Sequence, residues 1–367
     1  MENSKKMNMN IPDVSVKEVV EPLAKMYISA LNNRITFAAL PTPFLWGAAG
    51  VGKSDSVRQI GKEIENGTGK EVKITDVRLM LFSPVDLRGV PVADEKREFT
   101  NWLKPKIFDM KENVNVINIL FLDELSAAPQ SVQAAAYQIC LDRQIGEHKL
   151  PENCIVIAAG NRTTDHSVSY RMPKALCNRL LHFNVKSDYG SWREWAIKNG
   201  IDKRIIGYLG FDNTKLCVEP QSNDMAYPTP RSWMFCSNIL KAMNEPMEEL
   251  HYLLSGCIGI DTAVEFATWC QIYQSLPSME EILKGKSPSY PKKYDVLYAL
   301  VSSLVSVVEE RKNSISMKEL ENVCCYAKFF PADFAAMFFD DLRAIEGMQK
   351  QLMKCRAMQE WIGKSSI

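Results

Sequence analysis

The chain lacks the features that mark membrane and secreted proteins. No uninterrupted apolar stretch approaches the roughly 18–20 residues that a membrane-spanning helix needs. Residues 1–10 are polar, carry two lysines and have no apolar centre, so they do not resemble a secretory signal. We therefore expect a cytoplasmic protein that does not bind membranes.

Patterns for metal binding and disulfides are also missing. The four histidines show no metal-ligand spacing, and none of the ten cysteines forms a C-x-x-C pair. This argues against a zinc site. Cysteines scattered through apolar segments are typical of small buried side chains in a reducing compartment, which again indicates the cytoplasm.

Neither sign of charge is in excess. Lys and Arg number 44, as do Asp and Glu, so no net field attracts the chain to nucleic acid or to an acidic membrane. A local basic stripe would still suffice for nucleic acid, so this exclusion is weak. At 367 residues, with 46% hydrophobic and 24% charged residues, the composition is that of a globular protein of two or three domains.

The sequence does contain a glycine-rich turn with a phosphate-binding mechanism. The apolar run Phe44–Trp46 leads into a segment that fits G-x-x-x-x-G-K-[ST], and a helical pattern follows it. The segment consists of Gly47, Ala48, Ala49, Gly50, Val51, Gly52, Lys53 and Ser54. Glycines let the backbone wrap around a polyphosphate, and N–H groups at the helix start point at the anion. We expect Lys53 to reach the β- and γ-phosphates of ATP, and Ser54 to bind Mg²⁺.

Two adjacent carboxylates end an apolar run further along the chain. Residues Ile119–Leu122 lead directly into Asp123 and Glu124. At the carboxyl edge of a parallel sheet, these side chains lie beside the phosphate site of the first turn. We expect Asp123 to hold Mg²⁺ through water and Glu124 to polarise the attacking water. In isolation, two solvated carboxylates at a strand end fit the pattern equally well.

A further apolar run ends in a polar side chain. Residues Ile155–Ala159 are followed by Gly160 and Asn161. We expect the Asn161 side chain to hydrogen-bond the γ-phosphate or to orient the attacking water, although Gly-Asn is also an ordinary turn signal.

Strand and helix patterns alternate over the first half of the chain. The strand candidates are Phe44–Trp46, Val72–Leu79, Val116–Leu122, Cys154–Ala159 and Leu181–Val185. The helix candidates are residues 13–31, Ser54–Glu65, Gln130–Leu141 and Met172–Arg179. This alternation predicts right-handed crossovers and a largely parallel sheet, hence an α/β core.

The strand signal fades after about Lys186. Helical patterns then cover Tyr189–Lys198, Arg231–Met243, Ile260–Tyr273, Val296–Glu310 and Met317–Phe330. The Pro-, Ser- and Lys-rich connection Gly285–Lys293 is a candidate domain boundary. The stretch Phe329–Phe339, which contains five Phe residues and Met337, is predicted to form a core rather than a groove for a partner.

The order of these motifs resembles that of AAA+ ATPases of the MoxR type, over roughly residues 38–245. The glycine-rich turn and the Asp123-Glu124 pair match the Walker A and Walker B motifs, and Asn161 falls where the sensor-1 Asn sits. Ala175–Leu180 resembles the segment that carries the arginine finger, which makes Arg179 the candidate finger.

A second arginine follows from the same resemblance. Tyr227–Trp233 resembles the segment that opens the sensor-2 helix, with Arg231 as the sensor. Both arginines have plainer alternatives. Arg179 also suits a helix carboxyl end, where the dipole favours a cation, and Arg171 competes with it as the finger. Arg231 also suits a helix-start residue packed on an aromatic ring.

The resemblance implies two hairpins as well. Pro84–Gly89 resembles the D-L-x-G element of the family. The insert Val90–Trp102 would then be the hairpin that such proteins point toward the pore of a ring, unless it is an ordinary surface hairpin. Arg143–His148 fits a second hairpin.

The fold implied by the resemblance is an α/β P-loop NTPase core with a parallel sheet, residues 38–186. An N-terminal helix and tail, residues 1–37, precede it. An α-helical lid, residues 187–273, and a helical C-terminal extension, residues 274–367, follow. ATP would bind between core and lid. An arginine finger completes the site of a neighbouring subunit, so a ring, expected to have six members, is implied.

The activity implied is Mg²⁺-dependent ATP hydrolysis that remodels or activates a partner protein, often one with a von Willebrand factor A domain in that family. A second hypothesis is a nucleic-acid motor or nuclease-partner ATPase, which the zero net charge and the missing basic stripe disfavour. A third is a nucleotide-gated scaffold without hydrolysis, against which the intact Glu124 and Arg179 speak.

Overall fold

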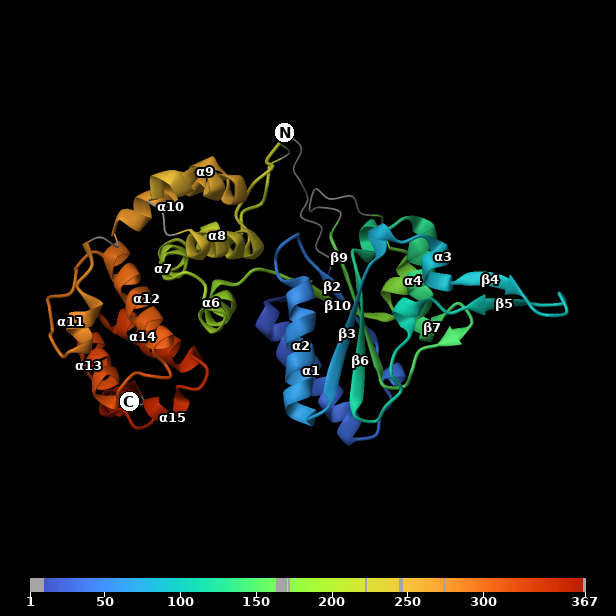
Figure 1. Ribbon diagram of the computed structural model, residues 1–367, viewed down its shortest axis with the longest axis horizontal. Coiled ribbons are helices and arrows are strands. Elements are labelled where there is room, and N and C mark those ends of the chain that lie inside the picture. Colours follow the sequence, from blue (N-terminus) through green and yellow to red (C-terminus); the bar gives the residue numbers. More distant parts are fainter. Residues whose placement is uncertain are drawn as a thin grey trace. The chain divides into compact units, whose positions relative to one another are not determined.

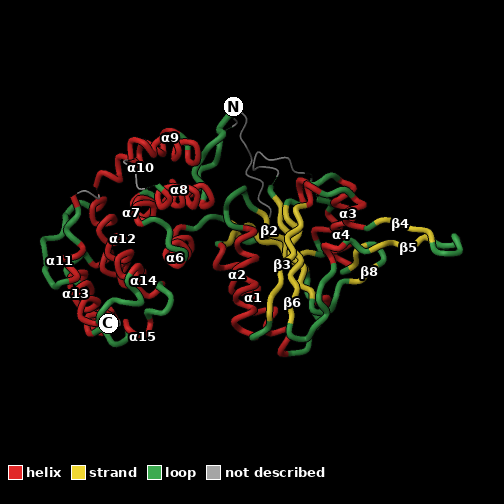
Figure 2. Tube along the Cα trace, in the orientation of Figure 1, coloured by secondary structure: helices red, strands yellow, loops and turns green. Residues whose placement is uncertain are grey.

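The computed structural model describes residues 10–162, 170, 172–221, 223–243, 247–272 and 275–365. The chain divides into two compact units, Met1–Ser187 and Asp188–Ile367. Strands lie in the first unit, whereas the described part of the second consists of helices and loops (Figure 2). The predicted α/β core with a parallel sheet, followed by a helical region, is confirmed.

Six parallel strands form the sheet of the first unit, in the order β1-β10-β2-β9-β6-β3. They are β1 (Asp13–Val14), β2 (Thr42–Trp46), β3 (Glu71–Arg78), β6 (Val116–Asp123), β9 (Cys154–Gly160) and β10 (Leu180–Val185). From β2 the chain runs to the far edge at β3, and it later crosses from β9 to β10 on the other side of β2. The carboxyl end of β2 is therefore the switch point at which open α/β sheets bind ligands.

Helices cover both faces of the sheet, because its central strands are apolar on both sides. Helices α1 (Val16–Asn32) and α2 (Lys53–Thr68) cover one face, and α3 (Pro84–Arg88) and α4 (Gln130–Asp142) cover the other (Figure 1). Within β6, Leu120 and Leu122 belong to the apolar core that includes Val132 and Ala136 of α4. The alternate residue Phe121 is equally buried and points to the opposite face.

Both hairpins predicted from the sequence are confirmed. Strands β4 (Val90–Ala93) and β5 (Thr100–Leu103) pair antiparallel and extend away from the sheet (Figure 1). Strands β7 (Gln144–Ile145) and β8 (His148–Lys149) form the second, shorter hairpin. The ring Nε2 of His148 lies 2.8 Å from the carbonyl oxygen of Trp102, so the two hairpins are in contact.

The second unit packs its helices around one apolar core, which runs from Trp192 to Met358. The helices are α6 (Tyr189–Lys198), α7 (Lys203–Phe211), α8 (Pro230–Ala242), α9 (Met247–Ile258), α10 (Ile260–Ile272), α11 (Met279–Leu283), α12 (Tyr294–Glu310), α13 (Met317–Ala327), α14 (Ala332–Ala344), α15 (Gln349–Leu352) and α16 (Arg356–Ser365). Phe334, Phe338 and Phe339 are buried in this core, as predicted. Phe329 is the exception, with 64% of its surface exposed.

The N-terminal segment differs from the prediction. Residues 13–31 were expected to be helical throughout, but Asp13 and Val14 form β1 at the edge of the sheet. The helix begins at Val16, because Ser15 and Glu18 form a capping box that satisfies the first free N–H groups. Two residues are too few to show a strand periodicity in the sequence.

Two predicted helices are shorter in the structure. The helix expected over Met172–Arg179 covers only Lys174–Cys177 (α5), because Pro173 disfavours a helical residue before it and β10 begins at Leu180. The helix expected over Met317–Phe330 ends at Ala327, ahead of Pro331. Across the described ranges, no helix combines the length and apolarity needed to cross a bilayer.

Candidate nucleotide-binding site

The glycine-rich turn between β2 and α2 uses backbone conformations that require glycine. Gly47, Gly50 and Gly52 all have positive φ, at 154°, 80° and 106°. A Cβ on Gly47 would lie 2.7 Å from the carbonyl oxygen of Val185, which leaves no room for a side chain. The turn can therefore follow a path close around a polyphosphate, with the first free N–H groups of α2 at its end.

The side chain of Lys53, the first residue of α2, is buried against this turn. Only 8% of its surface is exposed, and its ammonium group donates to the carbonyl oxygens of Gly47 at 2.6 Å and Ala48 at 2.8 Å. It also donates to Oδ1 of Asn161 at 2.9 Å. A buried cation needs such acceptors. The contact joins the turn to the carboxyl end of β9, 108 residues further along the chain.

Ser54 meets the first of the two predicted carboxylates. Its hydroxyl donates to Oδ2 of Asp123 at 3.0 Å, and the other oxygen of Asp123 accepts from the N–H of Glu124 at 2.8 Å. Hydroxyl and carboxylate oxygens are the ligands that Mg²⁺ takes in proteins. The donor set therefore fits Mg²⁺ at this point of the sheet edge.

Glu124 has a strained backbone. Its φ of 58° and ψ of 30° lie in the left-handed region, which residues other than glycine rarely adopt. The strained conformation ends β6 and starts the short turn η4 (Leu125–Ala127). Within the described residues, the Glu124 carboxylate forms no hydrogen bond or ion pair. Strained residues concentrate at functional sites, because the surrounding structure fixes the side chain there.

Ser126 fixes the backbone of Asn161, and sequence reasoning missed it. Its buried Oγ accepts from the Asn161 N–H and donates to the Asn161 carbonyl oxygen, both at 2.9 Å. A Cβ on Gly160 would lie 2.7 Å from the same Oγ, so the glycine before Asn161 makes room for this contact. A serine two residues after a carboxylate pair carries no distinctive sequence signal.

The carboxylate of Asp76 on β3 lies near enough to Asp123 to interact with its charge. Burial, and then the neighbouring Asp123 carboxylate, raise the pKa of Asp76 on β3. The rise means that the charged form of Asp76 is disfavoured, mainly by burial and in smaller part by repulsion from Asp123. A cation held by Ser54 and Asp123 would relieve this repulsion, which is consistent with the donor set described above.

The predicted arginine finger is not part of the hydrogen-bonded cluster of Lys53, Ser54, Asp123 and Asn161. Arg179 is exposed in the turn between α5 and β10, where its N–H donates to the Leu176 carbonyl oxygen at 3.0 Å. Its guanidinium forms no hydrogen bond or ion pair with any part of the chain that the structure describes. Arg171, the alternative finger, lies outside the described residues.

Arg231 belongs to the second unit. It is exposed in the first turn of α8, which begins at Pro230 as predicted and is capped by Thr229 and Ser232. Its position supports the predicted helix start. Its role as a sensor stays a prediction.

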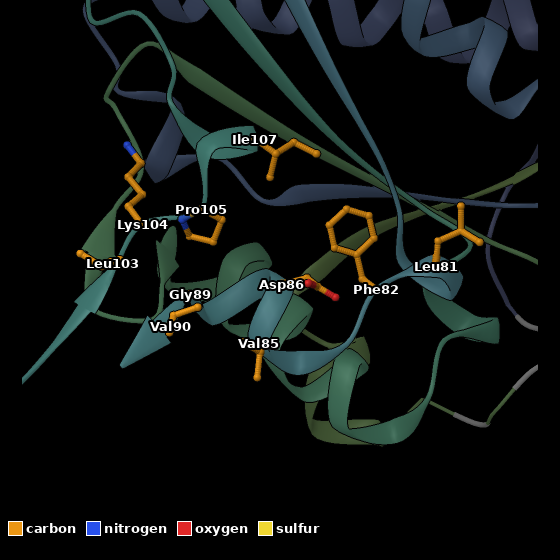
Figure 3. A pocket seen from close by; sticks show the side chains of 10 residues that line it. All are labelled: Leu81, Phe82, Val85, Asp86, Gly89, Val90, Leu103, Lys104, Pro105 and Ile107. Atoms are coloured by element: carbon orange, nitrogen blue, oxygen red, sulfur yellow. The ribbon is translucent and has the colours of Figure 1, made fainter. Parts of the chain in front are cut away.

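An apolar groove of about 520 Å³ lies beside the β4–β5 hairpin (Figure 3), and no residue of the glycine-rich turn lines it. Its lining includes Leu81, Val85, Val90, Leu103 and Ile107. All five side chains are substantially exposed. The hairpin therefore has an exposed apolar surface at its base.

Searches of protein-family models and of curated proteins found no match to the chain. Among solved structures, the chain is similar to two variants of RuvB from Thermotoga maritima. One is 16% identical with a TM-score of 0.35, over 86% of this chain and 92% of that chain. The other is 16% identical with a TM-score of 0.37, over 84% and 89%.

The chain is also similar to NtrX from Brucella abortus, in a structure with ATP. The identity is 14% and the TM-score 0.34, over 88% of this chain and 68% of that chain. TM-scores this low assign no role to any residue of this chain.

Proposed function

We propose that the chain is a Mg²⁺-dependent ATPase of the AAA+ class and of the MoxR type, which works as a ring. The observation that carries the proposal is the convergence of Lys53, Ser54, Asp123 and Asn161 through hydrogen bonds of 2.9 and 3.0 Å. Lys53 and Ser54 lie at the start of α2, just after β2, and the other two side chains lie at the carboxyl ends of β6 and β9, at the switch point of the sheet.

Each residue of the cluster has a task in phosphoryl transfer. Lys53 and the N–H groups at the start of α2 bind the phosphate oxygens. Ser54 and Asp123 would hold Mg²⁺, which would supply positive charge that offsets the charge developing on the phosphates. Glu124 accepts a proton from the attacking water, and Asn161 orients that water or the γ-phosphate.

Arg179 completes the site in the neighbouring subunit. Its exposure, and the lack of partners for its guanidinium among the described residues, leave it available to another chain. A cation delivered to the transition state in this way is worth on the order of 10³-fold or more in rate. We propose a ring of six, as the family resemblance implies. We also propose that Arg231 couples the nucleotide state to the helical unit.

For the work that hydrolysis drives, we propose the remodelling of a protein partner, one with a von Willebrand factor A domain. We propose that the β4–β5 hairpin faces the pore of the ring and contacts the partner there. Val92 exposes 43% of its surface and Phe99 exposes 71%, on a hairpin that extends from the body of its unit (Figure 1). Exposed apolar side chains gathered on one projecting element indicate an interaction surface.

The first test replaces the proposed general base. Glu124→Gln keeps the size of the side chain but cannot accept the proton, so we expect kcat to fall by about 10²-fold or more. Binding of a fluorescent ATP analogue should be unchanged, because the phosphate contacts come from other residues. The measurement pairs phosphate release with equilibrium binding.

The matched control for this test is Glu112→Gln. Glu112 is exposed in the loop before β6, at the opposite end of that strand from Glu124. The Glu112→Gln variant should hydrolyse ATP at the wild-type rate. Unchanged hydrolysis by the Glu124 variant would show that the site is assigned incorrectly.

A further inference from the structure

His182 on β10 links two segments that the proposed mechanism uses separately. Its ring Nδ1 accepts from the Nε1–H of Trp46 at 3.0 Å, and its Nε2 lies 2.7 Å from the carbonyl oxygen of Cys177. A carbonyl oxygen only accepts, so Nε2 carries the proton and Nδ1 is the acceptor. Both ring nitrogens of the neutral imidazole are therefore used.

The two partners of His182 sit next to functional positions. Trp46 is the last residue of β2, directly before Gly47, whose carbonyl oxygen accepts from Lys53. Cys177 ends α5, two residues before Arg179. One imidazole thus connects the end of β2, which leads into the glycine-rich turn, to the turn that presents the candidate arginine finger Arg179.

Aromatic packing makes this connection stiff. The rings of Trp46 and His182 stack with centroids 6.1 Å apart and 28° between their planes, and Phe44 lies 4.4 Å from the Trp46 ring. Phe44 and His182 are also register partners on the neighbouring strands β2 and β10. The imidazole can therefore move little relative to the phosphate-loop strand.

The segment that carries Arg179 needs this support. Helix α5 has four residues, too few to be stable by itself, since helix nucleation is costly. Leu176 and Cys177 are only partly buried against the apolar core of this face of the sheet. The hydrogen bond from His182 to the Cys177 carbonyl restrains the start of the turn before β10, whose other end is fixed by the pairing of Leu180 with Thr42 on β2.

We propose that His182 is a positioning residue, which holds Arg179 at the place from which it enters the neighbouring subunit's site. His182 also links the position of Arg179 to the glycine-rich turn (the phosphate loop) of its own subunit. The nucleotide bound by one subunit therefore affects the arginine that this subunit offers to the next. The proposal rests on the proposed function, because it requires that Arg179 acts on a neighbour.

The test begins with two substitutions. His182→Leu keeps apolar bulk but removes both hydrogen bonds, and we expect kcat to fall by up to about 10²-fold, as misplaced catalytic groups do. The affinity for a fluorescent ATP analogue should stay at the wild-type value. His182→Gln keeps a donor near the Nε2 position and should restore most of the lost turnover. A side chain that only fills space would show the reverse order, with Leu tolerated better than Gln.

Mixing subunits then separates an effect on the neighbour from an effect on the same subunit. His182→Leu subunits have an intact Glu124, and Glu124→Gln subunits have a correctly held Arg179. Mixed together, they should hydrolyse ATP although each is nearly inactive alone. If mixing restores nothing, His182 acts only on its own phosphate loop and the proposal is wrong.

Two further measurements keep the outcomes distinct. If Arg179→Ala hydrolyses ATP at the wild-type rate, the part of the proposed function that assigns the arginine finger to Arg179 fails, whatever the His182 variants do. If His182→Leu does not fold, as judged by thermal unfolding, Trp46→Phe replaces it, because it keeps an aromatic ring and removes the Nε1–H donor. It should lower kcat in the same direction and be rescued by the same mixing. A wild-type rate for Trp46→Phe would contradict the link to the phosphate loop.

Discussion

A single buried hydroxyl holds Asn161 at the phosphate loop. Ser126 Oγ bonds to both the N–H and the carbonyl oxygen of Asn161, and the side chain of Asn161 accepts from Lys53. Removing the hydroxyl leaves two backbone groups without their partner. The catalytic effect of Asn161 should thus depend on Ser126, which itself is not expected to touch the nucleotide.

Ser126→Ala should lower both stability and turnover. Leaving a buried polar group unpaired costs about 1–3 kcal/mol, so the free energy of unfolding should fall by that amount. A loosened Asn161 should also lower kcat by about an order of magnitude. Urea denaturation and phosphate release measure the two effects.

Ser303→Ala is the matched control, because the Ser303 hydroxyl is buried without a hydrogen-bond partner among the described residues. It should not lose stability. If Ser126→Ala behaves in the same way as this control, the Ser126 bridge does not hold Asn161.

Residue by residue, the sequence could identify side chains whose chemistry has a local signature. Lys53 and Ser54 follow a glycine pattern, and Asp123 follows an apolar run, so their meeting at one sheet edge was predictable from strand direction. His182 and Ser126 were not predictable. Their roles depend on strand register and on contacts with residues 136 and 35 positions away.

At the scale of elements, a buried ion pair joins the first helix of the second unit to one near its end. Arg193 on α6 donates from Nε to Oδ1 of Asp341 on α14 at 2.7 Å, and a second guanidinium N–H bonds the other oxygen. Both side chains expose 8% of their surface. Burial raises the pKa of Asp341, while Arg193 opposes the rise by favouring the carboxylate.

Asp341→Ala should destabilise the protein by about 3–5 kcal/mol, because it leaves the Arg193 charge buried and without its partner. The free energy of unfolding in urea measures the loss. The neighbouring Asp340 offers a matched control. It pairs with Arg343 at 3.2 Å, with side chains 69% and 47% exposed. Asp340→Ala should cost at most about 1 kcal/mol. Equal losses in the two variants would contradict a structural role for the buried pair.

The elements themselves differ in how far the sequence determines them. Strands such as β6 and β9 are continuous apolar runs, so burial on both faces gives them a strong signal. The strand β1 and the helix α5 have two and four residues, and their limits are set by capping at Ser15 and by Pro173. A periodic pattern needs more residues than these elements have, which is why their boundaries were wrong.

At the scale of the whole molecule, the proposed active site is composite. The phosphate loop, Asp123 and Glu124 come from one subunit, and Arg179 comes from the next. A subunit with Arg179→Ala still has a complete phosphate site, and one with Glu124→Gln still offers its arginine. Rings of either variant alone should be inactive, since every site then lacks one essential group.

Mixing the two variants should restore activity in a way that depends on their proportions. A site is complete only where an Arg179→Ala subunit receives its arginine from a Glu124→Gln neighbour, so with random assembly its frequency is the product of the two fractions. At equal amounts about a quarter of the sites are complete, whatever the number of subunits in a closed ring. Phosphate release across a series of mixing ratios should follow this product and peak at equal amounts. A flat series would exclude Arg179 as the residue that one subunit supplies to the next. Arg171 would then be the favoured candidate for that role.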